Sequence, residues 1–269
     1  MDNWGYGFRA AWRPLLSYFT ESKIKDFQDR GKRVMKASSI SATITNIARI
    51  RTDFPTKFGV PRQSGLVSLE ATIVFEPPYR DPSAIRGLEG FSHIWLIWQF
   101  SEAIGTKISP TVRPPRLGGN TRMGVFATRS PFRPNHIGLS SVRLERIEMH
   151  PQWGPILHVS GADMIDQTPI FDIKPYLPFT DSHPGATAGF AASHEAYKLQ
   201  VVFPPRWLTL IPESLRHGLY NVLEQDPRPA YVQDPARIFG ISFAGFDVRF
   251  IVENNILTVM HIECLDKGK

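Results

Sequence analysis

The ten residues FSHIWLIWQF, Phe91–Phe100, form an almost continuously apolar and aromatic stretch that indicates what kind of fold the chain adopts. The stretch is too short to cross a membrane, which takes about 18 to 20 apolar residues. Its aromatic and branched side chains are typical of a β-strand that is buried on both faces. We therefore expect a core β-strand here.

Other segments on both sides of this stretch alternate between apolar and polar residues, as half-buried strands do. Their connections are rich in turn-forming residues, because the chain contains 23 Pro and 20 Gly. Short strands joined by such turns favour a closed or sandwiched β domain, and no long helix separates them as a doubly wound α/β sheet would require. The other expected strands are Ile40–Ile47, Leu66–Phe75, Met123–Thr128, Leu139–Ile147 and Ile156–Ile165.

The C-terminal part of the chain predicts a small α+β unit. Pro212–Gln225 has leucines on one helical face and a proline suited to an early helical position. A strand is expected at Tyr197–Phe203, and Asn254–Asn255 suits a hairpin turn between Ile238–Val252 and Ile256–Glu263. We expect a mainly β fold with an N-terminal extension at 1–36, a β-barrel at 38–193 and an α+β subdomain at 194–269.

The charge of the chain is concentrated at its N-terminus. The formal net charge is +6, and residues 1–36 hold eight Lys/Arg against four Asp/Glu. The segment also contains the aromatic residues Trp4, Tyr6, Phe8 and Trp12. It could be a basic aromatic arm that contacts RNA or a partner, or a poorly ordered extension that precedes a native start near Met35. We expect the poorly ordered extension. It has no continuous apolar core of a signal peptide. The single cysteine, Cys264, excludes an internal disulfide and fits a reducing, cytosolic setting.

A second charged feature lies between Pro110 and Arg143, where six arginines occur without any Lys, Asp or Glu. Arginine makes planar, bidentate contacts to phosphate and carboxylate groups and stacks on bases. This segment therefore favours an anionic partner. It includes Arg113, Arg116, Arg122, Arg129 and Arg133.

Several familiar sites are absent from the sequence. It has no GxGxxG, no Walker loop, no HExxH and no GxSxG, and its eight histidines lack metal-ligand spacing. A nucleotide bound in the Rossmann manner and a metal centre are therefore not expected. The polar residues that could bind a ligand lie mostly in the loops between the expected strands. Loops held by a rigid barrel are where binding groups usually occur.

Five of these loop segments together resemble the TrmO family, also called TsaA-like, over about residues 40–265. The segments, in chain order, are FGVPRQSGLV, RGLEGFSHIW, PTVRPPRLGGNTRMGVFATRSPFRPN, DMIDQTPIFDIKPYLPF and QDPRPAY. The resemblance implies a β-barrel methyltransferase that uses S-adenosylmethionine to methylate the exocyclic nitrogen of adenosine 37 of tRNA, after that base has received a threonylcarbamoyl group. It also implies a cytoplasmic homodimer, with the cofactor held by barrel loops near the dimer interface.

Matched residue by residue, the resemblance assigns roles to specific positions. Arg129 would pair with the cofactor's carboxylate, and Asp163 or Asp166 would accept from its ammonium or ribose. Bacterial members often carry His-Gln where this chain has Ser101 and Glu102. The full cofactor set is Pro61, Arg62, Gln63, Ser101, Glu102, Arg129, Leu139, Asp163, Met164, Ile165 and Asp166.

The resemblance implies that two other groups of residues contact the tRNA acceptor. Asp226 and Tyr231 would hold the target base, and Arg228 would engage its threonyl carboxylate. Arg113, Arg116, Arg122 and Arg133 would contact phosphates of the anticodon stem-loop.

Three alternatives remain open at this point. The chain could methylate a different acceptor, it could be an RNA-binding β-barrel without catalysis, or its loops could serve dimerisation.

Overall fold

The computed structural model describes residues 42–114, 117, 121–194, 197–228 and 234–265. The chain divides into two units, Met1–Ile44 and Thr45–Lys269, and every element below belongs to the second. The expected extension at 1–36 lies outside the described residues. None of the described helices is long and apolar enough to cross a membrane.

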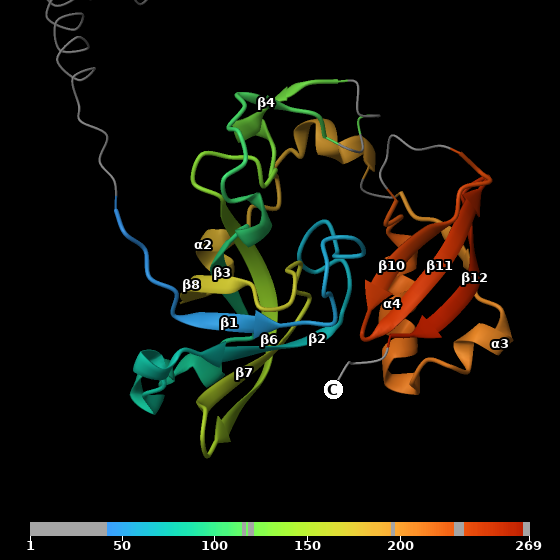
Figure 1. Cartoon of the computed structure of the whole chain (residues 1–269). Helices are drawn as coiled ribbons and strands as arrows, with labels where there is room; N and C mark the ends of the chain where they lie inside the picture. The colour runs from blue at the N-terminus through green and yellow to red at the C-terminus, as the bar shows by residue number, and fades with distance from the viewer. Residues whose placement is uncertain (1–41, 115–116, 118–120, 195–196, 229–233, 266–269) are drawn as a thin grey trace, which may run out of the picture. The chain divides into compact units, whose positions relative to one another are not determined.

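The first half of the second unit is a closed barrel of antiparallel strands, which confirms the expected fold class (Figure 1). Around the barrel the order is β1-β2-β7-β6-β3-β8, so closure joins the first strand to the last. In chain order the strands are β1 (Ala48–Arg51), β2 (Glu70–Phe75), β3 (His93–Gln99), β6 (Ile137–His150), β7 (Gly154–Ser160) and β8 (Pro169–Pro175).

Alternation of side chains fills the barrel interior. In β3, Ile94, Leu96 and Trp98 are buried, whereas the residues between them are only half-buried. The expectation that this strand is buried on both faces was therefore wrong. Its outer face is covered only in part, where Trp95 donates a hydrogen bond of 2.8 Å to Asp181.

Several of the expected strands differ from the observed ones. The described residues 42–47 of the expected strand Ile40–Ile47 form no strand, and β1 begins only at Ala48. The expected strand Ile238–Val252 is interrupted by a turn at Ala244 and Gly245, which both have positive φ.

Met123–Thr128 contributes only β5 (Met123–Gly124), which pairs with β4 (Thr111–Val112), and then continues as a 3₁₀ turn. The sixth barrel strand is instead β8, inside a segment that reads as a loop because prolines bound it at both ends. Proline is tolerated at the first position of a strand, where it interrupts no central hydrogen bond.

The second half of the unit is a four-stranded sheet with one face covered by a helix. The sheet has the order β10-β11-β12-β9, with β9 parallel to β12. The helix α4 (Glu213–Glu224) buries Leu219, Val222 and Leu223 against it, as its sequence pattern predicts. The strands are β9 (Gln200–Val202), β10 (Phe239–Phe243), β11 (Phe246–Glu253) and β12 (Ile256–Cys264).

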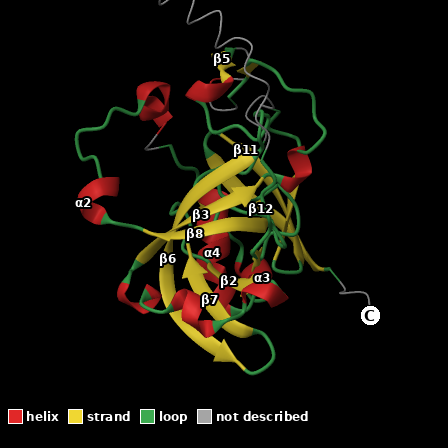
Figure 2. Cartoon of the chain, turned by 90° about the vertical axis from the view of Figure 1, so that its left-hand side faces the viewer, coloured by secondary structure: helices red, strands yellow, loops and turns green. Residues whose placement is uncertain are grey.

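Two short helices and several 3₁₀ turns complete the described chain, and strands predominate throughout (Figure 2). The helices are α2 (Pro178–Asp181) and α3 (Pro205–Leu208). Asn254 and Asn255 both have positive φ in the turn between β11 and β12, which confirms the expected hairpin.

The connection between β1 and β2, residues 52–69, belongs to the core of the second sheet. Phe54 and Val67 are each 2% exposed and pack with residues of α4, β10, β11 and β12. The backbone N–H of Ala244 donates to the carbonyl of Asp53 at 2.9 Å. This connection starts and ends in the barrel, so it joins the two halves physically.

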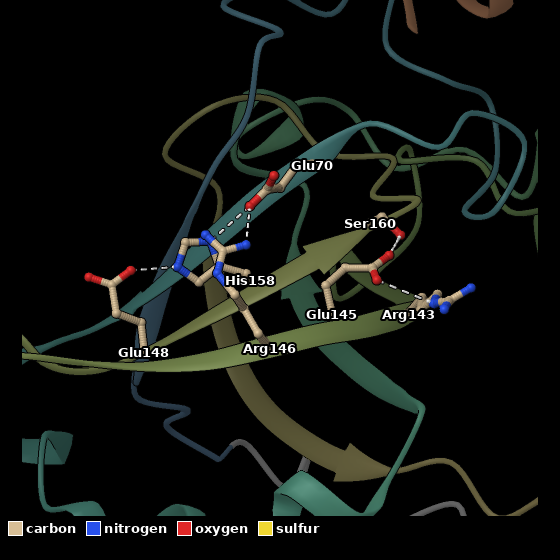
Figure 3. A network of polar contacts seen from close by, with 7 residues as sticks. All are labelled: Glu70, Arg143, Glu145, Arg146, Glu148, His158 and Ser160. Carbon is tan, nitrogen blue, oxygen red and sulfur yellow. Dashed lines mark hydrogen bonds and ion pairs between the residues drawn. The ribbon is translucent and has the colours of Figure 1, made fainter. Parts of the chain in front are cut away.

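The outer face of β2, β7 and β6 carries a network of charged side chains (Figure 3). His158 is 7% exposed, and its two ring nitrogens each lie 2.9 Å from a carboxylate oxygen, of Glu70 and of Glu148. Hydrogen bonds from Arg146 and then His158 lower the pKa of Glu70. The network therefore stabilises the barrel above the ordinary pKa of Glu70, and this contribution is lost as the pH falls.

Gly138 allows a close approach that a larger residue would prevent. It is paired with Trp98 across β3 and β6, and a Cβ atom at this position would lie 2.3 Å from Trp98 Cε2. Alanine is normally about 0.5–1 kcal/mol better than glycine within a strand. Because Trp98 is only 5% exposed, we expect Gly138→Ala instead to lower the free energy of unfolding by about 1–3 kcal/mol in urea denaturation.

The matched control is Gly124→Ala in β5, where nothing lies within 4 Å of the added atom. It should stay within about 0.5 kcal/mol of the unchanged protein. Equal stability of the two variants would contradict the close packing of Trp98.

Candidate functional site

A cavity of about 970 Å³ gathers segments that are far apart in the sequence. Its walls come from the β1–β2 connection, the 3₁₀ turn after β3, the loop before β6 and the segment after β7. The predicted cofactor residues that line it are Pro61, Arg62, Gln63, Ser101, Glu102, Arg129, Leu139, Asp163, Met164 and Ile165.

Asp166 does not line this cavity. Its carboxylate accepts a hydrogen bond of 3.0 Å from the backbone N–H of Thr52, and its own N–H donates to the carbonyl of Phe54 at 2.8 Å. Asp166 thus fastens the segment after β7 to the start of the β1–β2 connection.

Asp163 contributes a largely buried carboxylate to the cavity wall. Ser140 donates to it at 2.6 Å, and Trp98 Nε1 donates in turn to Ser140 at 2.9 Å. Burial raises the pKa of Asp163, although hydrogen bonds, first from Ser140, and the charge of Arg129 oppose this rise. Ser140 and Trp98 are supporting residues that the sequence did not reveal, because both look like ordinary strand positions.

The cationic side of the cavity is organised by Gln63. Arg129 Nη1 donates to Gln63 Oε1 at 2.5 Å, and Gln63 Nε2 donates to the carbonyl of Arg62. The guanidinium of Arg129 is therefore held at the cavity wall by a side chain of the β1–β2 connection. Arg129 and the carboxylate of Asp163 give one cavity both signs of charge.

The remaining predicted arginines have different positions. Arg133 also lines the cavity, and its Nη1 donates to the carbonyl of Thr128 at 3.3 Å. Arg113 and Arg122 are exposed and do not line it, and Arg122 bonds to Thr111 at 2.8 Å. Arg116 lies outside the described residues.

Asp226 and Arg228 form an ion pair with each other just after α4. Arg228 Nε and Nη2 donate to the two carboxylate oxygens of Asp226 at 2.7 and 2.9 Å, and both side chains are largely buried. Tyr197 also donates to Asp226, at 3.0 Å. Neither Asp226 nor Arg228 lines the cavity. Tyr231 lies outside the described residues. The assignment of Asp226, Arg228 and Tyr231 to the target base therefore stays a prediction.

A second cavity, of about 710 Å³, adjoins the first. Lys57 and Glu102 line both, and the second is bounded by Thr56–Phe58 on one side and by β10 on the other. Lys57 Nζ lies 5.6 Å from the ring centroid of Phe58, which is 49% exposed. Sequence reasoning missed this cavity because it depends on how the β1–β2 connection meets the second sheet.

Two family models match the chain in succession. The tRNA-methyltransferase O N-terminal domain matches residues 49–182, and the TrmO C-terminal domain matches residues 197–265. The first covers the barrel strands and the second covers β9 to β12.

Individual relatives agree with these models. The tRNA (adenine(37)-N6)-methyltransferase of Escherichia coli K12 is 43% identical over 226 residues, which is 81% of this chain and 96% of that protein. A protein of Pseudomonas aeruginosa, provisionally named an S-adenosylmethionine-dependent methyltransferase, is 38% identical over 77% of this chain and 91% of its own length.

A solved structure shares the fold. The crystal structure of TrmO from P. aeruginosa matches with a TM-score of 0.67 and 32% identity, covering 85% of this chain and 100% of that one. With two domain models in chain order and relatives matched over nearly their whole length, this chain belongs to the TrmO family.

Proposed function

We propose that this protein transfers a methyl group from S-adenosylmethionine to N6 of adenosine 37 in tRNA, and that this base already carries a threonylcarbamoyl group. Membership of the TrmO family and the names of the relatives support the reaction. The observation that carries the proposal is the cavity in which Pro61–Gln63, Arg129 and Asp163–Ile165 meet. Because tRNA is its acceptor, we propose that the protein works in the cytoplasm.

The chemistry of the cavity fits this cofactor. S-Adenosylmethionine has a carboxylate, an ammonium group, a sulfonium and an adenine. Arg129 offers a cation to the carboxylate, and Asp163 offers an anion to the ammonium or to a ribose hydroxyl. Trp98, Phe100 and Met164 supply apolar surface, and the cavity volume falls within the range of about 300–1,000 Å³ that is typical of small-molecule sites.

Bound in this cavity, the cofactor would supply an activated methyl group. The protein then has to align the acceptor nitrogen with that group and exclude water, and such positioning lowers the barrier by several kcal/mol. The adenine amine is a poor nucleophile and loses a proton on methylation. The buried side chains around Asp163 provide the dry, fixed surroundings that alignment requires.

The second cavity is the place that we propose for the acceptor. Lys57 and Glu102 line both cavities, so a base inserted in the second would lie beside the cofactor cavity. A base must leave its stack to enter such a pocket. The exposed ring of Phe58 suits base stacking, and Lys57 suits a nearby phosphate. Arg113, Arg122 and Arg133 would contact the anticodon stem-loop.

We also propose that the protein acts as a homodimer. Phe126, Phe132 and Leu139 line the cofactor cavity and are 80%, 47% and 57% exposed. Apolar side chains that rim a binding site at such exposures are typical of a surface covered by a partner. A second copy of the chain would cover this rim and exclude water from the cavity.

Nucleoside mass spectrometry tests the reaction. Purified protein with S-adenosylmethionine and tRNA should add one methyl group to threonylcarbamoyladenosine. By calorimetry, Arg129→Ala should weaken cofactor binding by about 1.5–3 kcal/mol, because a charge-assisted contact is lost. Arg143→Ala, which removes an exposed arginine on the barrel wall, is the control and should bind normally.

Each alternative has its own outcome. A folded protein that binds RNA but not S-adenosylmethionine would be a non-catalytic RNA-binding barrel. Cofactor binding without methylation of this nucleoside would indicate a family member with a different acceptor.

Asp163→Asn should have opposite effects on thermal stability and on cofactor binding. Burial raises the pKa of Asp163, so its contribution to stability is complete below the ordinary value of 3.8 and is lost as pH rises through the folded-state value. Asparagine keeps an acceptor for Ser140 without the buried charge. We therefore expect the variant to melt at a higher temperature than the unchanged protein at neutral pH, with a difference that shrinks on acidification.

The same variant should bind S-adenosylmethionine about tenfold or more weakly, since it offers no anion to the ligand. Melting curves across pH and calorimetry measure the two effects. Unchanged cofactor affinity would exclude Asp163 as a ligand-binding residue.

A further inference from the structure

The side chain of Arg62 reaches away from its own loop to the turn that follows α4. Its Nη2 atom donates to the backbone carbonyl of Asp226 at 2.9 Å and to that of Arg228 at 3.1 Å. One guanidinium nitrogen carries two hydrogens, so both are used on this turn. Arg62 thus joins the β1–β2 connection to the segment after the helix.

The turn that receives Arg62 has an unusual backbone conformation. Asp226 has a φ of +52°, in the left-handed region that costs most non-glycine residues about 1–2 kcal/mol. The ion pair with Arg228 and the hydrogen bond from Tyr197 hold the Asp226 side chain from two directions. Burial alone would raise the pKa of Asp226, but the hydrogen bonds and charge of Arg228 outweigh it and lower the pKa. The charged carboxylate of Asp226 therefore stabilises the conformation of the turn.

The loop that Arg62 anchors forms part of the cofactor cavity wall. Gln63, the next residue, accepts from Arg129 and donates to the carbonyl of Arg62 itself. A continuous series of hydrogen bonds therefore runs from the Asp226–Arg228 pair through Arg62 and Gln63 to Arg129. This series begins just after α4, in the half of the unit that contains the second sheet, and ends at the wall of the cofactor cavity.

We propose that Arg62 is a positioning residue, and that the Asp226–Arg228 pair acts on the cofactor cavity through it instead of gripping the acceptor. The pair fixes the carbonyls of the turn, the carbonyls fix Arg62, and Arg62 fixes the cavity loop. The part of this proposal that concerns cofactor affinity rests on the proposed function. The part that concerns the loop does not.

The first experiment needs no ligand. Hydrogen exchange is followed by mass spectrometry on a peptide spanning residues 58–66, in which the N–H of Gly65 donates to the carbonyl of Gly161 at 2.9 Å. Arg62→Lys keeps the charge but loses the planar fork, and Asp226→Asn keeps a residue that tolerates positive φ but loses the ion pair. Both should exchange this peptide about tenfold faster than the unchanged protein.

Glu224→Gln is the matched control. Glu224 ends the same helix and pairs with Lys198 at 2.9 Å, yet no hydrogen bond joins its side chain to Arg62 or to the turn. It should leave the exchange of the 58–66 peptide unchanged. Melting temperatures of all variants separate local loosening from general destabilisation.

The second experiment measures S-adenosylmethionine affinity by calorimetry. Arg62→Lys and Asp226→Asn should each raise the dissociation constant by about tenfold, with Glu224→Gln unchanged. The double variant should bind no more weakly than Arg62→Lys alone, because both substitutions break the same series of contacts. A general loss of structure would not give this equality.

Three results would overturn the proposal. The first is peptide exchange in both variants at the rate of the unchanged protein. The second is a double variant whose dissociation constant for the cofactor rises by the product of the increases seen in the two single variants. The third is an Asp226→Asn protein with normal exchange and cofactor affinity but tenfold slower tRNA methylation, which would make the pair a direct acceptor contact. An unchanged protein that binds no S-adenosylmethionine would instead contradict the proposed function, and the exchange result would still decide the role of Arg62.

Discussion

The burial of Phe54 and Val67 in the core of the second sheet is the interaction on which the site depends. These two residues belong to a connection between adjacent barrel strands, which would otherwise be a long surface loop. Large apolar side chains that are 2% exposed give such a connection a defined conformation. Pro61–Gln63 lie between them, so this part of the cavity wall is anchored to the core on both sides.

Around this constraint the remaining walls follow from the barrel. Ser140 donates a hydrogen bond to Asp163 and accepts one from Trp98 on the neighbouring strand, while Gly138 leaves room for the indole ring. The anion of the site is thus set by the barrel interior. The cation, Arg129, is set by Gln63 of the connection. The two charges face one cavity because the connection packs on the second sheet and returns to the barrel.

Much of this arrangement could be predicted from the sequence, for physical reasons that differ between elements. The periodicity of α4 and the Asn254–Asn255 turn are local signals, and the structure confirmed them. β8 was missed because Pro169 and Pro175 resemble loop boundaries, and the barrel pairing that makes the segment a strand is distant in sequence. The side-chain partners of Asp226 and Arg62 could not be foreseen either. An arginine looks free in a sequence until the fold brings carbonyl groups within its reach.

The order of the strands has a consequence for biosynthesis. The barrel closes only when Ala48 pairs with Ile170, and the core that holds Phe54 also requires Leu257, Val259 and Ile262 of the last strand. A chain still emerging from the ribosome therefore has barrel strands long before it has a finished cavity loop. Contacts so distant in sequence form late, because their loop-closure entropy must be overcome first. The nascent protein acquires its complete cavity only after β12 has been synthesised and released.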